Sequence, residues 1–148
     1  MTPAALRTRT LLVLAHHVRR VQADELWKAT GKLLRSAMTA GLHQGPSKFP
    51  DIQNFEGELR RGVWVIIVKL DLGAFLTYCM LVMLRDDDFT CNAPSNVDEV
   101  DLFDAVANLP VSKPLEKSTD CVFQVALAGS LTLRLQSISE SISRLGNI

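Results

Sequence analysis

The chain has 148 residues, of which 47% are apolar and 22% charged, the size and composition of one globular domain. Its formal net charge is zero, which removes the electrostatic argument for binding nucleic acid or an anionic membrane. Residues 1–50 hold eight basic and two acidic side chains, a net charge of +6, and the remainder carries −6. Such asymmetry can steer a partner, but solvated helix faces that compensate each other within one fold are the expected reason.

Apolar residues at helical spacing predict a first helix over about residues 5–21 and a second helix that Asp24 caps. The second helix should end at Gly41, because glycine readily adopts the left-handed conformation of a helix C-terminus. Gly31 lies inside this helix, where it indicates the close approach of a neighbouring helix.

Residues 44–54 are rich in proline and glycine and are predicted to form a loop. A third helix should begin near Asn54. Its segment 63–84 is as long and apolar as a membrane span, but Lys69 and Asp71 near the middle would each cost about 3 kcal/mol in a bilayer. We therefore interpret it as a buried central helix and expect no membrane contact.

After an irregular stretch, Asp98 is expected to cap a short helix that runs to about residue 108. Residues 109–117 form a second predicted loop, and the last helix begins at 118–120. Its apolar residues recur at three- and four-residue steps: Leu131, Leu135, Ile138, Ile142 and Leu145. The predicted fold class is all-α, an irregular multi-helix bundle around a long buried central helix, with residues 1–148 as a single domain.

Cysteine usage argues against a disulfide framework and a structural zinc site. Cys79, Cys91 and Cys121 are widely spaced, whereas structural zinc needs four ligands in close pairs. Adjacent His16 and His17 project about 100° apart on a helix and cannot easily share a metal ion. We expect a reducing intracellular compartment and neither a metal ion nor another cofactor.

No phosphate loop, nucleophile elbow or dinucleotide fingerprint is present. Five charged side chains interrupt the helix predicted to be most buried: Glu58, Arg60, Arg61, Lys69 and Asp71. Buried charges must be paired or reach the surface. Arg60 or Arg61 bridging to an acidic residue across a helix interface is the structural interpretation, and an acid–base pair lining a pocket is the functional one. His43 follows the predicted helix stop, where its imidazole can reach free carbonyls.

Three stretches bring these features together: residues 26–43 (LWKATGKLLRSAMTAGLH), 56–71 (EGELRRGVWVIIVKLD) and 85–102 (RDDDFTCNAPSNVDEVDL). In order and separation they resemble the fungal-specific transcription factor domain, the middle homology region of zinc-cluster transcription factors, over about residues 8–136. The residues that match are Trp27, Gly41, Leu42, His43, Glu58, Arg60, Arg61, Trp64, Asp71, Pro94 and Asn96.

The resemblance implies an all-helical regulatory domain that holds activity in check, responds to metabolites or co-regulators, and works in the nucleus. Its matching residues would be architectural, forming a helix stop, a charged lock between helices and a rigid loop. The cysteine cluster that binds DNA in this family is missing from these residues. We therefore expect no direct contact between this chain and nucleic acid.

The chain also departs from the family. Gly62 stands where a third basic residue is usual, Thr90 lies where an acidic residue is frequent, and residues 78–81 replace a Gly-x-Pro turn. Without that turn chemistry, we expect the central helix to continue further, or Tyr78 and Cys79 to open onto a changed pocket.

Three functions fit these observations. We favour a regulatory domain that binds a small-molecule effector or a protein partner. The alternative is a repurposed cytoplasmic enzyme, a small cyclase or isomerase of fungal secondary metabolism, with Tyr78, His43, Asp71 and Glu58 as acid–base groups. The third is a non-catalytic dimerisation partner, including a homodimer, that acts through its last helix.

Overall fold

The computed structural model describes residues 3–19, 22–104 and 110–145. In these ranges five α-helices and one 3₁₀ turn follow one another, and no strand is present. The elements are α1 (Pro3–Val18), α2 (Ala23–Thr39), the 3₁₀ turn η1 (Pro46–Lys48), α3 (Asn54–Tyr78), α4 (Glu99–Asp104) and α5 (Val122–Leu145). The predicted all-α class is confirmed.

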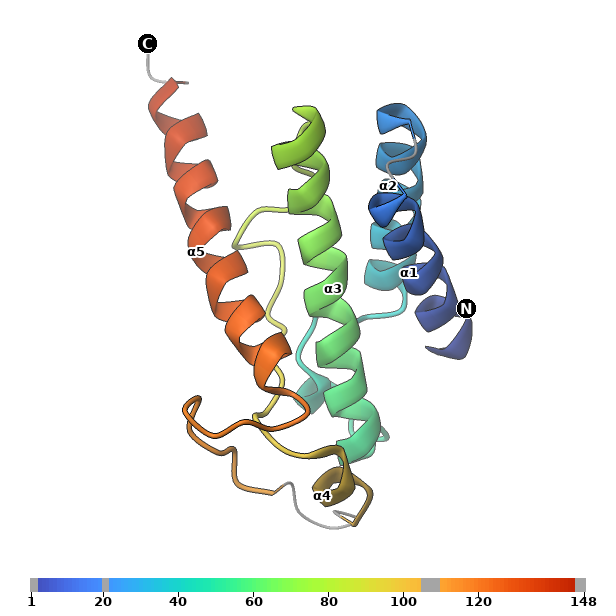
Figure 1. Ribbon diagram of the computed structural model, residues 1–148, viewed down its shortest axis with the longest axis vertical. Coiled ribbons are helices and arrows are strands. Elements are labelled where there is room, and N and C mark those ends of the chain that lie inside the picture. Colours follow the sequence, from blue (N-terminus) through green and yellow to red (C-terminus); the bar gives the residue numbers. More distant parts are fainter. Residues whose placement is uncertain (1–2, 20–21, 105–109, 146–148) are drawn as a thin grey trace.

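Helix α3 is the centre of the bundle, with α1 and α2 on one side and α5 on the other (Figure 1). It contacts every other described helix, and α1 also packs on α2. Helices α1 and α5 do not contact each other within the described ranges. One face of α3 is therefore left between them.

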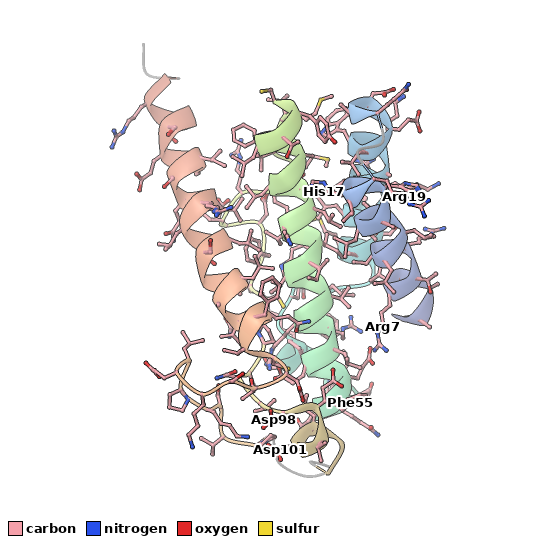
Figure 2. The ribbon with its side chains drawn as sticks, viewed as in Figure 1. Arg7, His17, Arg19, Phe55, Asp98 and Asp101 are labelled. Atoms are coloured by element: carbon pink, nitrogen blue, oxygen red, sulfur yellow. The ribbon has the colours of Figure 1, made fainter. Side chains whose placement is uncertain are left out.

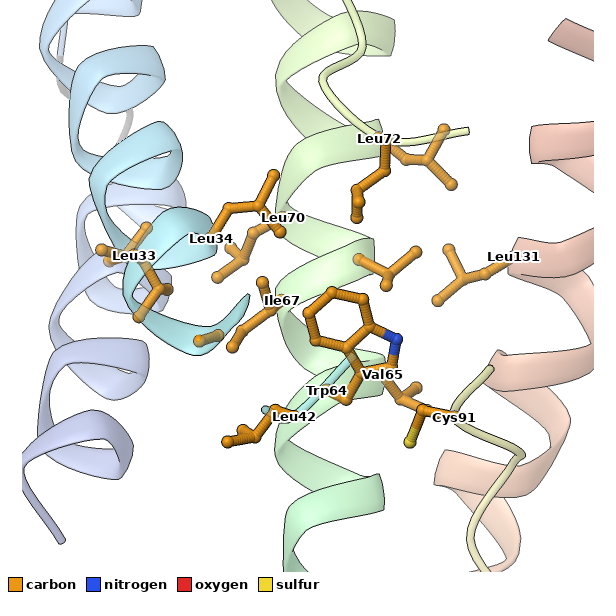
Figure 3. Packing of buried hydrophobic residues seen from close by; sticks show 14 of the residues in the cluster. Leu33, Leu34, Leu42, Trp64, Val65, Ile67, Leu70, Leu72, Cys91 and Leu131 are labelled. Atoms are coloured by element: carbon orange, nitrogen blue, oxygen red, sulfur yellow. The ribbon is translucent and has the colours of Figure 1, made fainter. Parts of the chain in front are cut away.

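The core lies where α3 meets α2 and α5 (Figure 3). Trp64 and Ile67 of α3 are 1% and 0% exposed, and Leu33 of α2 and Leu131 of α5 pack in the same cluster. Burying side chains of this size stabilises the fold by about 1.5–3 kcal/mol each. The predicted buried central helix is present, and no helix in the described part of the chain is long and apolar enough to cross a bilayer.

The expectation that the central helix continues past residue 78 is wrong. Helix α3 ends at Tyr78, because Cys79 adopts the left-handed conformation with φ 54° and its N–H bonds to the carbonyl of Phe75 at 2.9 Å. A non-glycine residue is uncommon in this conformation, but here it supplies the turn that glycine supplies elsewhere. Cys79 is exposed, and Tyr78 packs against the core.

The chain after Cys79 runs back along the bundle and covers α2 as well as α3. The indole N–H of Trp27 lies 3.4 Å from the carbonyl oxygen of Leu81. A Cβ atom at Gly31 would lie 3.1 Å from the sulfur of Met83. The neighbour that requires Gly31 is therefore this returning segment, and the predicted neighbouring helix was wrong.

Several predicted boundaries shift by a few residues. The N-cap of α2 is Gln22, and Asp24 lies inside the first turn, where it pairs with Lys28 at 3.1 Å. The last helix begins at Val122, two residues beyond the predicted 118–120. The predicted end of the short helix at residue 108 lies outside the described residues, as do the side chains of Ile142 and Leu145.

Candidate functional site

The predicted helix stop at Gly41 is present in full. Gly41 has φ +77°, its N–H bonds to the carbonyl of Met38 at 2.9 Å, and the N–H of Leu42 bonds to that of Ala37 at 3.0 Å. These two bonds make a Schellman C-cap, which satisfies carbonyls at the end of α2. Leu42 is 5% exposed and packs into the core.

Arg60 of α3 completes this helix end. One of its terminal nitrogens donates to the carbonyl of Ala40 at 2.5 Å, and its guanidinium lies 5.5 Å from the ring centroid of Phe49. The imidazole of His43 was expected at the end of α2, but the structure places Arg60 there. The backbone carbonyl of His43 instead accepts the N–H groups of Thr90 and Cys91 at 2.9 and 3.1 Å.

Glu58 and Arg61 form the buried ion pair of this region. Glu58 is 5% exposed, and its carboxylate accepts Arg61 together with the backbone N–H and hydroxyl of Ser95 at 2.8 and 3.1 Å. Arg61 lies on the same helix as Glu58, so the prediction of an ion pair across a helix interface was wrong. The link between elements is the bond from Glu58 to Ser95, which no sequence signal indicated.

Asn96 joins the two long loops before α5. It is 1% exposed, and its side-chain amide donates to the carbonyls of Lys113 and Pro114 at 3.0 and 2.8 Å. Its side-chain oxygen accepts the hydroxyl of Thr119 at 2.5 Å. Pro94 is buried beside it. The predicted rigid loop is therefore a hydrogen-bonded clasp around one buried amide.

Asp71 is a buried acid in the C-terminal half of α3. It is 1% exposed, and one carboxylate oxygen accepts the backbone N–H groups of Met83 and Leu84 at 3.0 and 3.1 Å. Burial raises the pKa of Asp71 to about 6, and the two backbone hydrogen bonds oppose that rise. The acid therefore fastens the returning segment after Cys79 to α3.

The four acid–base candidates do not come together. Glu58, Asp71 and Tyr78 all lie on α3, where thirteen residues separate Glu58 from Asp71 by about 20 Å along the axis. His43 lies in the loop after α2, with its ring 6.3 Å from that of Trp64. In the described ranges no group of three or more His, Cys, Asp or Glu side chains is placed to hold a metal ion.

The candidate site is an open groove of about 650 Å³ on the face of α3 between α1 and α5, named here the α1–α5 groove. Leu59, Val63 and Ile66 of α3 form its floor, and Leu11 and Leu14 of α1 form one wall. The opposite side consists of Leu102, Cys121 and Gln124. Ligand cavities in proteins commonly have this size and a mainly apolar lining.

Gly62 allows the side chain of Gln124 from α5 to pack closely against α3 at the groove. It lines the groove, and a Cβ atom there would lie 2.9 Å from the side-chain oxygen of Gln124. A larger side chain at this position would require Gln124 to move. The sequence pattern marked Gly62 as a departure but did not indicate its contact with Gln124 of α5.

Comparison with known proteins shows similarity to segments of fungal transcription factors. The chain is 32% identical over 133 residues to transcription factor opdR of Penicillium oxalicum, a match that covers 90% of this chain and 17% of opdR. It is 30% identical over 122 residues to the Zn(2)-C6 fungal-type transcription factor mpsB of Macrophomina phaseolina, with 82% of this chain and 16% of mpsB covered. It is 27% identical over 131 residues to the equisetin cluster transcription factor eqxF of Fusarium heterosporum, with 88% and 19% covered.

The chain thus spans less than a fifth of the length of these relatives. It matches no protein-family profile, and no solved structure shows significant similarity to it. The predicted relationship to fungal zinc-cluster regulators is confirmed at the level of homology to one segment of such proteins.

Proposed function

We propose that this chain is a regulatory domain of a fungal transcription regulator, which acts in the nucleus through a small-molecule effector or a protein partner. The observation that carries the proposal is the similarity of 82–90% of the chain to transcription factors such as mpsB and opdR. A match of this extent relates nearly the whole bundle to those proteins and not a short shared motif.

The composition supports a role other than DNA contact. A zinc cluster with two metal ions requires six cysteines, and these 148 residues contain three, none of them closely paired. The net charge of zero provides no general attraction for phosphate. A regulatory role for this segment agrees with both facts.

The geometry supports a binding role. Gly41 ends α2, and Glu58 and Asn96 form hydrogen bonds to loop residues, so these three residues stabilise the bundle. The α1–α5 groove lies open beside α3 and has a mainly apolar lining. The cyclase or isomerase alternative receives no such support, because Tyr78, His43, Asp71 and Glu58 face different surroundings.

A reporter experiment tests the proposal. The chain is inserted between a heterologous DNA-binding module and an activation segment, and reporter expression is compared with that from a flexible linker of equal length. We expect the intact chain to lower expression several-fold. Ile67→Asp, which places a charge at a fully buried position, should unfold the chain and restore expression.

Equal expression from the intact chain and the linker would contradict the proposed regulation. The control for expression level is an immunoblot of each fusion, since an unfolded insert can be degraded.

A further inference from the structure

A smaller recess of about 170 Å³ lies beside the α1–α5 groove, between the start of α3 and the end of α2. Arg7, Leu59 and Val63 line both spaces, so the recess adjoins the groove. The recess adds Glu56 and Arg60 to the lining. The groove is therefore mainly apolar along its length and charged at one end.

The charged end carries an excess of positive charge. Arg7 and Arg60 contribute two guanidinium groups and Glu56 one carboxylate, a net charge of +1. Glu58 in the groove is already paired with Arg61, and the exposed Glu99 does not line the recess. This net positive charge favours the binding of an anionic group.

Arg7 is placed to receive such a group. Its side chain extends from α1 toward the start of α3, where Phe55 lies (Figure 2). One of its terminal nitrogens donates to an oxygen of Glu56 at 2.9 Å, and its side chain is 39% exposed. A guanidinium has five N–H donors in a planar fork that suits a carboxylate, so further donors remain for a ligand.

Glu56 provides a complementary acceptor. Its second oxygen, Oε1, is buried and has no hydrogen-bond partner among the described residues. The oxygen open to a ligand is therefore Oε2, since the Glu56 side chain is 31% exposed. Oε2 accepts one bond from Arg7, and a carboxylate oxygen can accept a second donor. The recess therefore offers donors on Arg7 next to an acceptor oxygen on Glu56.

We propose that the groove binds a lipophilic hydroxy acid, with its chain over the floor of α3, its carboxylate on Arg7 and its hydroxyl donating to Glu56. This inference rests on the proposed role as an effector-binding regulatory domain and specifies the chemical class of that effector. The groove volume of about 650 Å³ lies in the range of small-molecule sites. A cationic ligand is disfavoured by Arg7 and Arg60.

Isothermal titration calorimetry on the 148-residue chain tests the ligand class with four probes that share one tail. These are 3-hydroxydodecanoate, dodecanoate, 1-dodecanol and dodecylamine, each below its micelle concentration. We expect 3-hydroxydodecanoate to bind most tightly, dodecanoate next, 1-dodecanol at least tenfold more weakly than dodecanoate, and dodecylamine weakest. Equal affinity for the acids and the alcohol would overturn the assignment of the charged end.

Two matched pairs of variants test whether the ligand binds in the α1–α5 groove. Arg7→Gln should weaken binding of both acids at least tenfold and leave 1-dodecanol unchanged, whereas Arg9→Gln removes a charge from the same helix outside the groove and should change little. Leu11→Glu places a negative charge in the groove and should abolish acid binding. Leu12→Glu is the control, since Leu11 and Leu12 are 65% and 55% exposed but only Leu11 lines the groove.

Sedimentation equilibrium tests whether a second copy of the chain, and not a small molecule, occupies the groove. A dimer that Leu11→Glu dissociates and that excludes the acid probes would show a second copy in the groove and overturn the proposal. Acid binding that persists in a chain without effect on the reporter would refute the proposed regulatory function but not the ligand site. Loss of regulation on Arg7→Gln together with loss of acid binding is the result that supports both.

Discussion

The carboxylate of Asp71 and the backbone N–H of Leu84 are joined by a hydrogen bond of 3.1 Å, although thirteen residues separate them in the chain. The same oxygen accepts the N–H of Met83 at 3.0 Å. Together with the left-handed turn at Cys79, these bonds lead the chain back along α3. A buried acid and one residue in the left-handed conformation therefore make the turn in this chain, which lacks the Gly-x-Pro turn of the family it resembles.

Removal of this acceptor should loosen the returning segment. Asp71→Ala leaves two backbone N–H groups unpaired, and we expect the free energy of unfolding to fall by about 2–4 kcal/mol. Asp71→Asn retains an acceptor oxygen and should cost much less. Urea denaturation followed by circular dichroism measures both values, and equal stability of the alanine variant and the parent chain would refute this role.

The stability of the chain should also depend on the titration of Asp71. Its pKa is raised from 3.8 to about 6 by burial, so the folded state holds the proton more tightly than the unfolded state. The resulting stabilisation is complete below pH 3.8 and is lost as pH rises through 6, a change of up to about 3 kcal/mol.

The measurement is the difference in unfolding free energy between Asp71→Asn and the parent chain at several pH values. Because asparagine does not titrate, this difference should move in favour of the variant as pH rises from 4 to 7. Other titrating groups are common to both proteins and cancel. A difference that is constant over this interval would contradict the raised pKa.

Local signals in the sequence predicted most of the fold. Gly41 marked a helix end, Asn54 a helix start, and the apolar segment after residue 63 a central helix, because capping chemistry and apolar periodicity act within a few residues. Asp71 was recognised as a charge that needs a partner. Its partners are backbone groups beyond a turn, and no side-chain pattern indicates those.

The candidate site was less accessible to sequence reasoning. Arg7 and Glu56 form an ion pair between α1 and α3, and forty-nine residues separate them. Glu56 lies in the first turn of α3, where the helix dipole alone accounts for an acidic side chain, so the sequence gives no sign of a partner on α1. Gly62 was noted as a missing basic residue, but its contact with Gln124 and the groove beside it depend on how α1 and α5 pack on α3.

The contribution of an ion pair to the free energy of unfolding should depend on how deeply the pair is buried. Glu58→Ala removes a carboxylate that is 5% exposed and leaves Arg61 and the N–H of Ser95 without their acceptor. We expect a loss of about 3–5 kcal/mol in unfolding free energy. Asp24→Ala breaks the exposed pair with Lys28, where the side chains are 56% and 64% exposed, and should change the stability very little.

Denaturant titrations of these two variants at pH 7 give the comparison directly. Arg61→Ala with Glu58→Ala should be less damaging than the sum of the single changes, because the first loss already disrupts the shared interaction. Similar small effects at Glu58 and Asp24 would show that the buried pair contributes no more than the exposed one.

Two glycines should respond to alanine in opposite directions. Gly41 has φ +77°, and an added Cβ would lie 2.7 Å from the ring carbon Cζ of Phe49. The left-handed conformation alone costs alanine about 1 kcal/mol, and Phe49 must also move, so we expect Gly41→Ala to destabilise the chain by about 2–3 kcal/mol.

Gly129 is the matched control because it lies inside α5 and an added Cβ would meet no atom within 4 Å. Alanine is favoured over glycine by about 1 kcal/mol in a helix interior, so Gly129→Ala should stabilise the chain by about 0.5–1 kcal/mol. Thermal unfolding of both variants beside the parent chain measures the two shifts. A stabilising Gly41→Ala would refute the left-handed helix stop, and a destabilising Gly129→Ala would show that this face of α5 is packed against another surface.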